Sequence, residues 1–151
     1  MAAKKDSAAF LLFGEKSNRQ SLMALACALE REGVYNAEIV IGGEKLMAAA
    51  QNLLRRSERL AVGFSFFSSQ ACASAAAAAQ LRARFGGRVF LFAGGPHPCG
   101  DIKGTLALGF DAVAAGEGEK TLPAFMKAFA RGADWRAVCG IFSLRGAAQR
   151  G

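Results

Sequence analysis

The sequence predicts an α/β protein built on a doubly wound parallel sheet with helices on both faces. Short apolar runs alternate along the chain with segments of helical periodicity, which is the pattern of a parallel sheet. The apolar runs lack the polar alternation of half-exposed strands, so we expect these strands to be buried on both faces. Most of the runs end at glycine. At 151 residues, the chain has the size of a single domain.

The first strand and helix lie near the start of the chain. Residues 8–13 (AAFLLF) form an unbroken apolar run that stops at Gly14. The polar residues at 17–20 form a potential capping box, and the apolar residues within 22–29 recur at helical spacing. Gly33 is the predicted end of this helix.

Two further pairs of strand and helix follow. The strand predicted at 37–41 leads into a helix at 46–54 that carries its leucines and Met47 on one face. The strand at 60–64 continues into SFFSSQ at 65–70, whose hydroxyl and aromatic side chains suit either a helix cap or the wall of a pocket. The helix at 71–85 begins with a run rich in alanine, which favours helix and permits close packing on a sheet.

Glycine turns follow the fourth and fifth strands. The apolar run at 88–93 breaks into GGPHP at 94–98, and the run at 111–115 breaks into GEGE at 116–119. Glycine permits positive φ and close approach of the backbone to a ligand. In doubly wound sheets, ligands bind where the strands end. These two turns are therefore the first candidates for a binding site.

The rest of the chain completes the predicted fold. A short helix is expected at 102–108, a further helix is expected to start at 121–123 with its proline in the first turn, and a last turn and short strand are expected within 135–144. Five right-handed βα units with one crevice predict the flavodoxin-like or Rossmann-like strand order 2-1-3-4-5.

This strand order brings three loops to one place. The loops after the first and third strands, 14–18 and 65–69, meet at the switch point, and the loop after the fourth strand, 94–100, lies beside them. We therefore expect these three loops to converge on one ligand.

Composition narrows the classes of function. The net charge is +7, but the 19 basic residues are dispersed and aromatic residues are not interleaved with them, which predicts a solvated basic surface without specific nucleic-acid binding. No window is apolar enough to span a membrane, and the first apolar run is too short for a signal peptide. These observations favour a cytoplasmic protein with no membrane partner.

The four cysteines, at positions 27, 72, 99 and 139, form no C-x-x-C pair. Scattered cysteines in a chain without a secretory signal are predicted to be buried small hydrophobic residues rather than disulfides or metal ligands. We expect no metal ligand in this chain.

Residues for catalysis are few. His97 is the single histidine, and it lies between two prolines. Glu117 and Glu119 are more typical of a turn and a helix start than of a catalytic pair. The chain has neither a phosphate-binding P-loop nor G-x-G-x-x-G after the first strand. No catalytic residue is predicted, and a hydrolase using Glu117, Glu119 or His97 is the weakest alternative.

Three segments together carry a family resemblance: AGGPHP at 93–98, LGFDAVAAGEGEKTLP at 108–123 and VGFSFFSSQ at 62–70. With them the chain resembles the N-terminal cobalamin-binding domain of cobalamin-dependent radical S-adenosylmethionine enzymes. The similarity covers residues 8–144 and is strongest over 89–123.

The resemblance implies that a corrinoid lies over the carboxyl edge of the sheet, with its nucleotide tail threaded between strands. Ser65 and Phe67 match the family's S-x-[LTF] position, Gly94 and Gly95 match the glycine pair that makes room for the tail, and residues 116–119 match the turn beside it. The implied cofactor-binding residues are Gly14, Ser65, Phe67, Ser68, Gly94, Gly95, Pro96, His97, Gly116, Glu117, Gly118 and Glu119.

One difference between this chain and other cobalamin domains concerns the protein ligand of the cobalt. Some cobalamin domains supply a histidine from D-x-H-x-x-G after the first strand, but this chain has GEKSN at 14–18. The sequence H-x-x-G beginning at His97 follows the fourth strand instead. We therefore expect cobalt to be bound without a protein histidine, and His97 to form part of the pocket wall or to stiffen its loop.

A second departure concerns the radical chemistry. The chain lacks the C-x-x-x-C-x-x-C triplet that binds the 4Fe-4S cluster. Residues 1–146 are thus expected to be a cobalamin-binding Rossmann domain, and residues 147–151 the start of a linker to a radical S-adenosylmethionine domain, with methyl transfer one candidate reaction. A stand-alone corrinoid carrier is also open. The alternative is a flavodoxin-like domain that binds another nucleotide cofactor or a protein partner.

Overall fold

The computed structural model describes residues 6–34 and 37–144, so the predicted boundary at 146 and the linker at 147–151 lie outside the described residues. Six strands form one sheet in the order β2-β1-β3-β4-β5-β6. The first five are parallel and β6 is antiparallel to β5. This confirms the predicted α/β class and the order 2-1-3-4-5. The strands are β1 (Asp6–Gly14), β2 (Ala37–Ile41), β3 (Ser57–Ser65), β4 (Val89–Gly94), β5 (Ala112–Ala114) and β6 (Ile141–Phe142).

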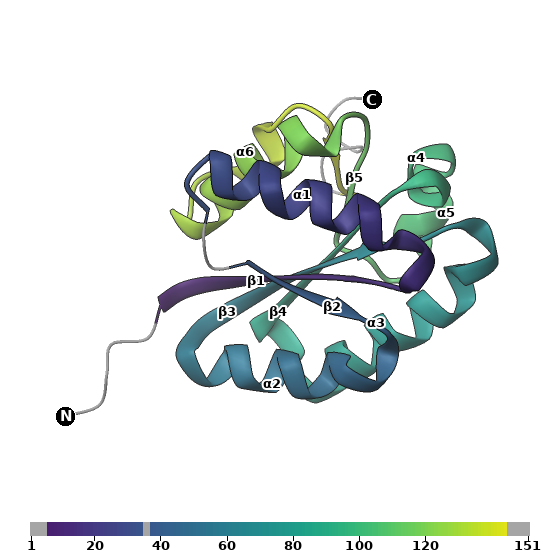
Figure 1. Cartoon of the computed structure of the whole chain (residues 1–151), viewed down its shortest axis with the longest axis horizontal. Helices are drawn as coiled ribbons and strands as arrows, with labels where there is room; N and C mark the ends of the chain where they lie inside the picture. Colours follow the sequence, from purple (N-terminus) through teal and green to yellow (C-terminus); the bar gives the residue numbers. More distant parts are fainter. Residues whose placement is uncertain (1–5, 35–36, 145–151) are drawn as a thin grey trace.

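Helices cover both faces of the sheet (Figure 1). The helices are α1 (Arg19–Arg31), α2 (Leu46–Arg56), α3 (Ala71–Phe85), α4 (Pro96–Gly100), α5 (Ile102–Ala107) and α6 (Gly118–Ala130). Helices α1 and α6 lie on one face, and α2 and α3 lie on the other. None of the helices in the described part of the chain is long and apolar enough to cross a lipid bilayer.

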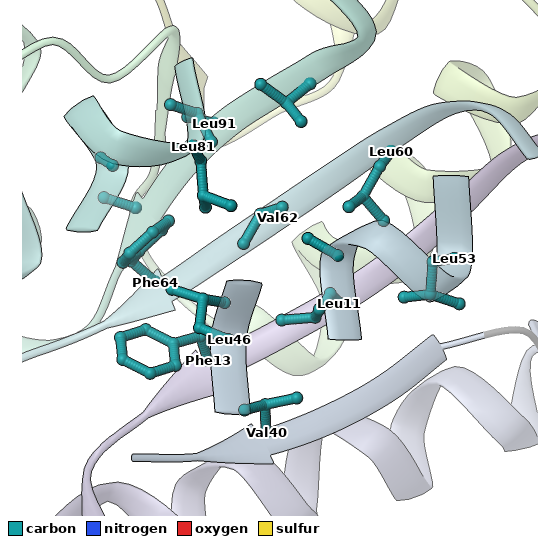
Figure 2. Packing of buried hydrophobic residues seen from close by; sticks show 14 of the residues in the cluster. Leu11, Phe13, Val40, Leu46, Leu53, Leu60, Val62, Phe64, Leu81 and Leu91 are labelled. Carbon is teal, nitrogen blue, oxygen red and sulfur yellow. The ribbon is translucent and has the colours of Figure 1, made fainter. Parts of the chain in front are cut away.

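The alternation of side chains along β1 separates two cores. Leu11 and Phe13 join the cluster under α2 and α3, whereas Phe10 and Leu12 join the cluster under α1 and α6. Figure 2 shows the first cluster, in which side chains of β1 and β3 pack against α2. Because successive side chains of a strand point to opposite faces, an apolar run without alternation fills both cores at once.

Two helices begin where the sequence analysis did not place them. Residues 96–100, expected as a loop, form α4, with Pro96 at the first helical position, where its fixed φ is favourable. Helix α6 begins at Gly118 rather than near Thr121, so Pro123 lies inside the helix and not in its first turn. The reason is local, because the amides of Lys120 and Thr121 both donate to the Glu117 carbonyl at 3.0 Å.

The prediction that the cysteines are buried is wrong. All four are free and exposed. Cys27 and Cys72 show why, since the apolar stripes of α1 and α3 are filled by other residues, such as Leu22 and Leu29 in α1 and Leu81 in α3. Within residues 6–34 and 37–144, no group of three potential metal ligands occurs.

Arginines gather at the amino edge of the sheet, where the helices that follow the strands end. Arg88 donates to the carbonyls of Leu54 at 2.7 Å and Ser57 at 3.1 Å. Arg59 donates to the carbonyl of Phe129 at 3.0 Å, near the end of α6. Cations at helix C-termini stabilise the carbonyl groups that have no partner within the helix. These arginines therefore have a structural role in closing the ends of α2 and α6.

Candidate cofactor site

A cavity of about 610 Å³ lies at the carboxyl edge of the sheet, among the ends of β1, β3, β4 and β5, and is flanked by α1 and α6. Apolar side chains and glycines make up most of its lining. The lining residues are Leu12, Asn18, Gln20, Ser21, Leu22, Ala24, Leu25, Gly63, Phe64, Ser65, Phe67, Phe92, Gly94, Gly95, Pro96, Cys99, Ala114, Gly116, Gly118, Glu119 and Leu122. Its volume is in the range of cofactor and small-ligand sites.

Two adjacent glycines at the end of β4 differ in what they contribute. Among the described residues other than its chain neighbours, a Cβ atom at Gly94 would have within 4 Å only the carbonyl oxygen of Ala114, at 3.4 Å, and the Cβ of Ala114, at 4.0 Å. Gly95 has φ +100°, and a Cβ there would lie 3.0 Å from the Ser65 hydroxyl oxygen. Gly94 thus keeps this part of the cavity lining free of a side chain that the backbone could otherwise accommodate, whereas Gly95 provides a turn that few other residues adopt.

Contacts between the three predicted loops hold this edge together. Ser65 is paired with Gly94 in the sheet, and the amide of His97 donates to the Phe66 carbonyl at 3.3 Å. The side-chain amide of Gln70 donates to the Ser17 hydroxyl at 3.1 Å. The loops after β1, β3 and β4 therefore meet at one place, and their common ligand remains a prediction.

Eight of the residues predicted for the site line the cavity: Ser65, Phe67, Gly94, Gly95, Pro96, Gly116, Gly118 and Glu119. They come from the ends of β3 and β4 and the turns that follow them, from α4, from the turn after β5 and from the start of α6. Glu119 lies in the first turn of α6, where the partial positive charge of the helix favours a carboxylate.

Four predicted residues lie outside this lining: Gly14, Ser68, His97 and Glu117. A Cβ atom at Gly14 would lie 3.0 Å from the Cδ1 atom of Leu22, so this glycine permits close packing of β1 against α1. The Nδ1 atom of His97 lies 2.9 Å from the Ser68 hydroxyl oxygen, and the imidazole stacks on Phe66 at a centroid distance of 5.8 Å.

Glu117 pairs with Lys120, and the two atoms that form the ion pair are 2.9 Å apart. The hydrogen bond from Lys120, and secondly its charge, lower the pKa of the Glu117 carboxyl, and the same pair raises the pKa of the Lys120 ammonium. Both side chains are exposed, so solvent screens this pair. Their charges compensate each other outside the cavity.

The charge of the cavity lining is low. Among the described residues that line it, none is basic, and Glu119 is the one carboxylate. The remaining polar side chains are amides and hydroxyls, for example Asn18, Gln20 and Ser65. A lining without cations is a poor match for a polyphosphate, which proteins hold with arginine, lysine or a metal ion.

Several lining residues were not found by the sequence analysis, chiefly Gln20, Ser21 and Leu25 of α1 and Phe92 of β4. The helix residues carry no signal of their own, because the pocket depends on how α1 and α6 sit on the sheet. Gly63, in contrast, did carry a signal in the sequence. An isolated glycine within a strand marks a close approach of another group, and the ring of Phe92 lies against it.

A comparison with protein families decides the class of the domain. The model of a family described as B12 binding domain matches residues 14–126. The chain belongs to the B12-binding domain family. The match contains every residue that lines the cavity of this B12-binding domain except Leu12. Neither the curated proteins nor the solved structures gave a significant match.

Membership of the B12-binding domain family supports cobalamin as the ligand, and the chemistry of the cavity lining is compatible with the nucleotide tail of that molecule. Apolar side chains of Leu12, Phe92 and Leu122 line it, as an aromatic base requires. Gly94 and Gly116 present backbone without side chains, which allows close approach of a bulky group. The tail of cobalamin carries a single phosphodiester, so the absence of basic residues in the described lining is no obstacle.

Proposed function

We propose that this B12-binding domain holds cobalamin with the nucleotide tail in the cavity between α1 and α6 and the corrin ring over the carboxyl edge of the sheet. The observation that carries the proposal is the largely apolar cavity among the ends of β1, β3, β4 and β5, where Gly94 keeps the lining free of a side chain. Ligands of doubly wound sheets bind at this edge.

The residues of the cavity have separable roles in this proposal. Leu12, Phe92 and Leu122 would contact the aromatic base and shield its faces from water. The Ser65 hydroxyl and the Asn18 amide would hydrogen-bond to the polar part of the tail, and Glu119 would accept a hydrogen bond from a ribose hydroxyl. Bound cobalamin supplies the reactivity of its cobalt–carbon bond, while the protein supplies binding and orientation.

We propose further that no protein histidine binds the cobalt. His97 lies outside the cavity lining, stacks on Phe66 and shares a hydrogen bond with Ser68. The turn after β1 has glutamate, lysine, serine and asparagine at 15–18, none of which is an imidazole. The pocket and the tail, rather than an axial ligand from the chain, then determine affinity.

The partner that we propose is a radical S-adenosylmethionine domain, in the same polypeptide or in another. The motifs AGGPHP and DAVAAGEGEKT support this proposal. The present sequence has no C-x-x-x-C-x-x-C, so another segment or chain must bind the 4Fe-4S cluster and S-adenosylmethionine. We expect the same or a neighbouring gene to encode that cysteine triplet; a genomic neighbourhood without one would contradict this part of the proposal.

Titration of the purified domain with hydroxocobalamin, followed by absorbance and calorimetry, tests the proposal of cobalamin binding. We expect saturable binding of one cobalamin per chain, and no binding of flavin mononucleotide or nicotinamide dinucleotides under the same conditions. Binding of flavin or a dinucleotide with no binding of corrinoid would replace this proposal with a flavodoxin-like function for another nucleotide.

A further inference from the structure

The floor of the cavity contains an aromatic ring that lies across the neighbouring strand. A Cβ atom at Gly63 of β3 would lie 2.5 Å from the Cζ atom and 2.6 Å from the Cε2 atom of Phe92. The outer end of the Phe92 ring therefore occupies the space that a side chain at position 63 would fill. Both residues line the cavity.

The Phe92 ring is fixed in this position by its neighbours. Its residue is 3% exposed, and its ring packs against that of Phe125 with centroids 5.1 Å apart. Phe125 is itself fully buried and also packs against Phe129 and Trp135. Because protein interiors are densely packed, Phe92 cannot swing away without displacing this aromatic cluster.

We infer that Phe92 is the residue that determines how large an aromatic base the cavity accepts. This inference rests on the proposed function, since it concerns the base at the end of the cobalamin tail. A base that reaches farther into the cavity meets the ring of Phe92 supported by Gly63 and Phe125. In apolar pockets, a difference of one methylene changes affinity about 10- to 200-fold, so an additional fused ring should be rejected.

Three corrinoids and three proteins provide the test. The corrinoids are cobalamin, a cobamide whose base is naphthimidazole and so carries one more fused ring, and cobinamide, which lacks the nucleotide tail. The proteins are the wild type, Phe92→Leu and the matched control Phe90→Leu. Phe90 lies on the same strand and packs against the same Phe125 ring, but it does not line this cavity. The Kd of each protein for each corrinoid is measured by absorbance titration.

The wild type and Phe90→Leu should bind the naphthimidazole cobamide at least about tenfold more weakly than cobalamin. In Phe92→Leu this ratio should fall below about threefold, while the Kd for cobinamide stays unchanged. An unchanged ratio in Phe92→Leu would overturn the inference and leave the proposed function intact. Failure of the wild type to bind any of the three corrinoids would overturn both.

Folding of each variant is checked by circular dichroism and thermal unfolding. If Phe92→Leu does not fold, Phe92→Met is used in its place, because methionine conserves most of the core volume and its flexible side chain yields to a larger base. In that variant too, the ratio must fall for the inference to hold, and a ratio equal to that of the wild type would overturn it.

Discussion

Two hollows of similar size lie at opposite edges of the sheet, and their linings differ. The cavity at the carboxyl edge measures about 610 Å³ and is lined by apolar residues, glycines and neutral polar groups. The cleft at the amino edge measures about 500 Å³ and includes the guanidinium groups of Arg59, Arg82, Arg88 and Arg136, with Asp111 the carboxylate among its described residues. Volume alone does not distinguish a binding site from a structural cleft.

The hydrogen-bond and ion-pair partners of the lining residues do distinguish the two hollows. At the amino edge, Arg88 and Arg59 donate to backbone carbonyls, and Arg82 pairs with Asp111. At the carboxyl edge, the described lining residues include no basic side chain and one carboxylate, Glu119, and a Cβ atom at Gly94 would meet Ala114 only at ordinary van der Waals distances. We interpret the amino-edge cleft as a consequence of how the arginines close the helix ends. The carboxyl-edge cavity is the one that we assign to a ligand.

The largest expected effect is on cobalamin binding when Gly94 is replaced by leucine. Gly94 does not have positive φ, so leucine can adopt its backbone conformation, and the side chain enters the cavity. We expect the Kd for cobalamin to rise by at least about 100-fold, which corresponds to ~2.7 kcal/mol. Calorimetric titration measures it.

Gly87→Leu is the matched control for this substitution. Gly87 also lacks positive φ and lies at the amino-edge cleft, and among the described residues no atom beyond its chain neighbours lies within 4 Å of its expected Cβ. Its replacement should leave the Kd within about twofold of the wild type, since surface changes away from a site have small effects. Equal losses in both variants would show that the comparison of the two edges is wrong.

The next largest effect is a loss of folding stability when Arg88, at the amino edge of the sheet, is replaced. Replacing Arg88 with alanine removes donors to the carbonyls of Leu54, Ser57 and Glu58. We expect the free energy of unfolding to fall by about 1–2 kcal/mol, with cobalamin binding unchanged, as measured by urea denaturation and titration. Arg84→Ala, which loses one exposed hydrogen bond to Gln51, should cost less than about 0.5 kcal/mol. A weakened affinity in Arg88→Ala would assign the cleft to the ligand.

A smaller effect is expected for His97→Ala. The imidazole lies outside the cavity lining, so the Kd for cobalamin should change by less than about threefold, in line with surface substitutions. The electron paramagnetic resonance spectrum of bound cob(II)alamin should show no nitrogen splitting in the wild type or the variant. A nitrogen splitting that disappears in His97→Ala would identify His97 as a cobalt ligand, contrary to our proposal.

The smallest effect concerns the exposed pair of Glu117 and Lys120. Because Lys120 lowers the pKa of Glu117 below its ordinary value of 4.5, the pair stabilises the fold above that pH, and this contribution is lost as pH falls through the pKa of the folded state. In Lys120→Met, an NMR titration should show a higher pKa for Glu117. An identical pKa in both proteins would show that the pair does not form in solution.

The sequence predicted most of the fold because the apolar runs and the glycines that end them are local signals. It misplaced the start of α6, since the Glu117 carbonyl accepts two amides in a way that residue preferences do not reveal. Ser65, Gly94 and Gly116 could be predicted as residues of the cavity because they lie at or just after strand ends. Ser21 and Leu25 of α1 could not, because their position in the lining depends on how the helices pack.

A crystal structure of the domain with bound cobalamin tests the central claim most directly. We expect the dimethylbenzimidazole base to lie in the cavity between α1 and α6, in contact with Leu12, Phe92 and the backbone of Gly94. A base bound in the arginine-lined cleft at the amino edge, or a carboxyl-edge cavity left empty beside a bound corrinoid, would contradict it.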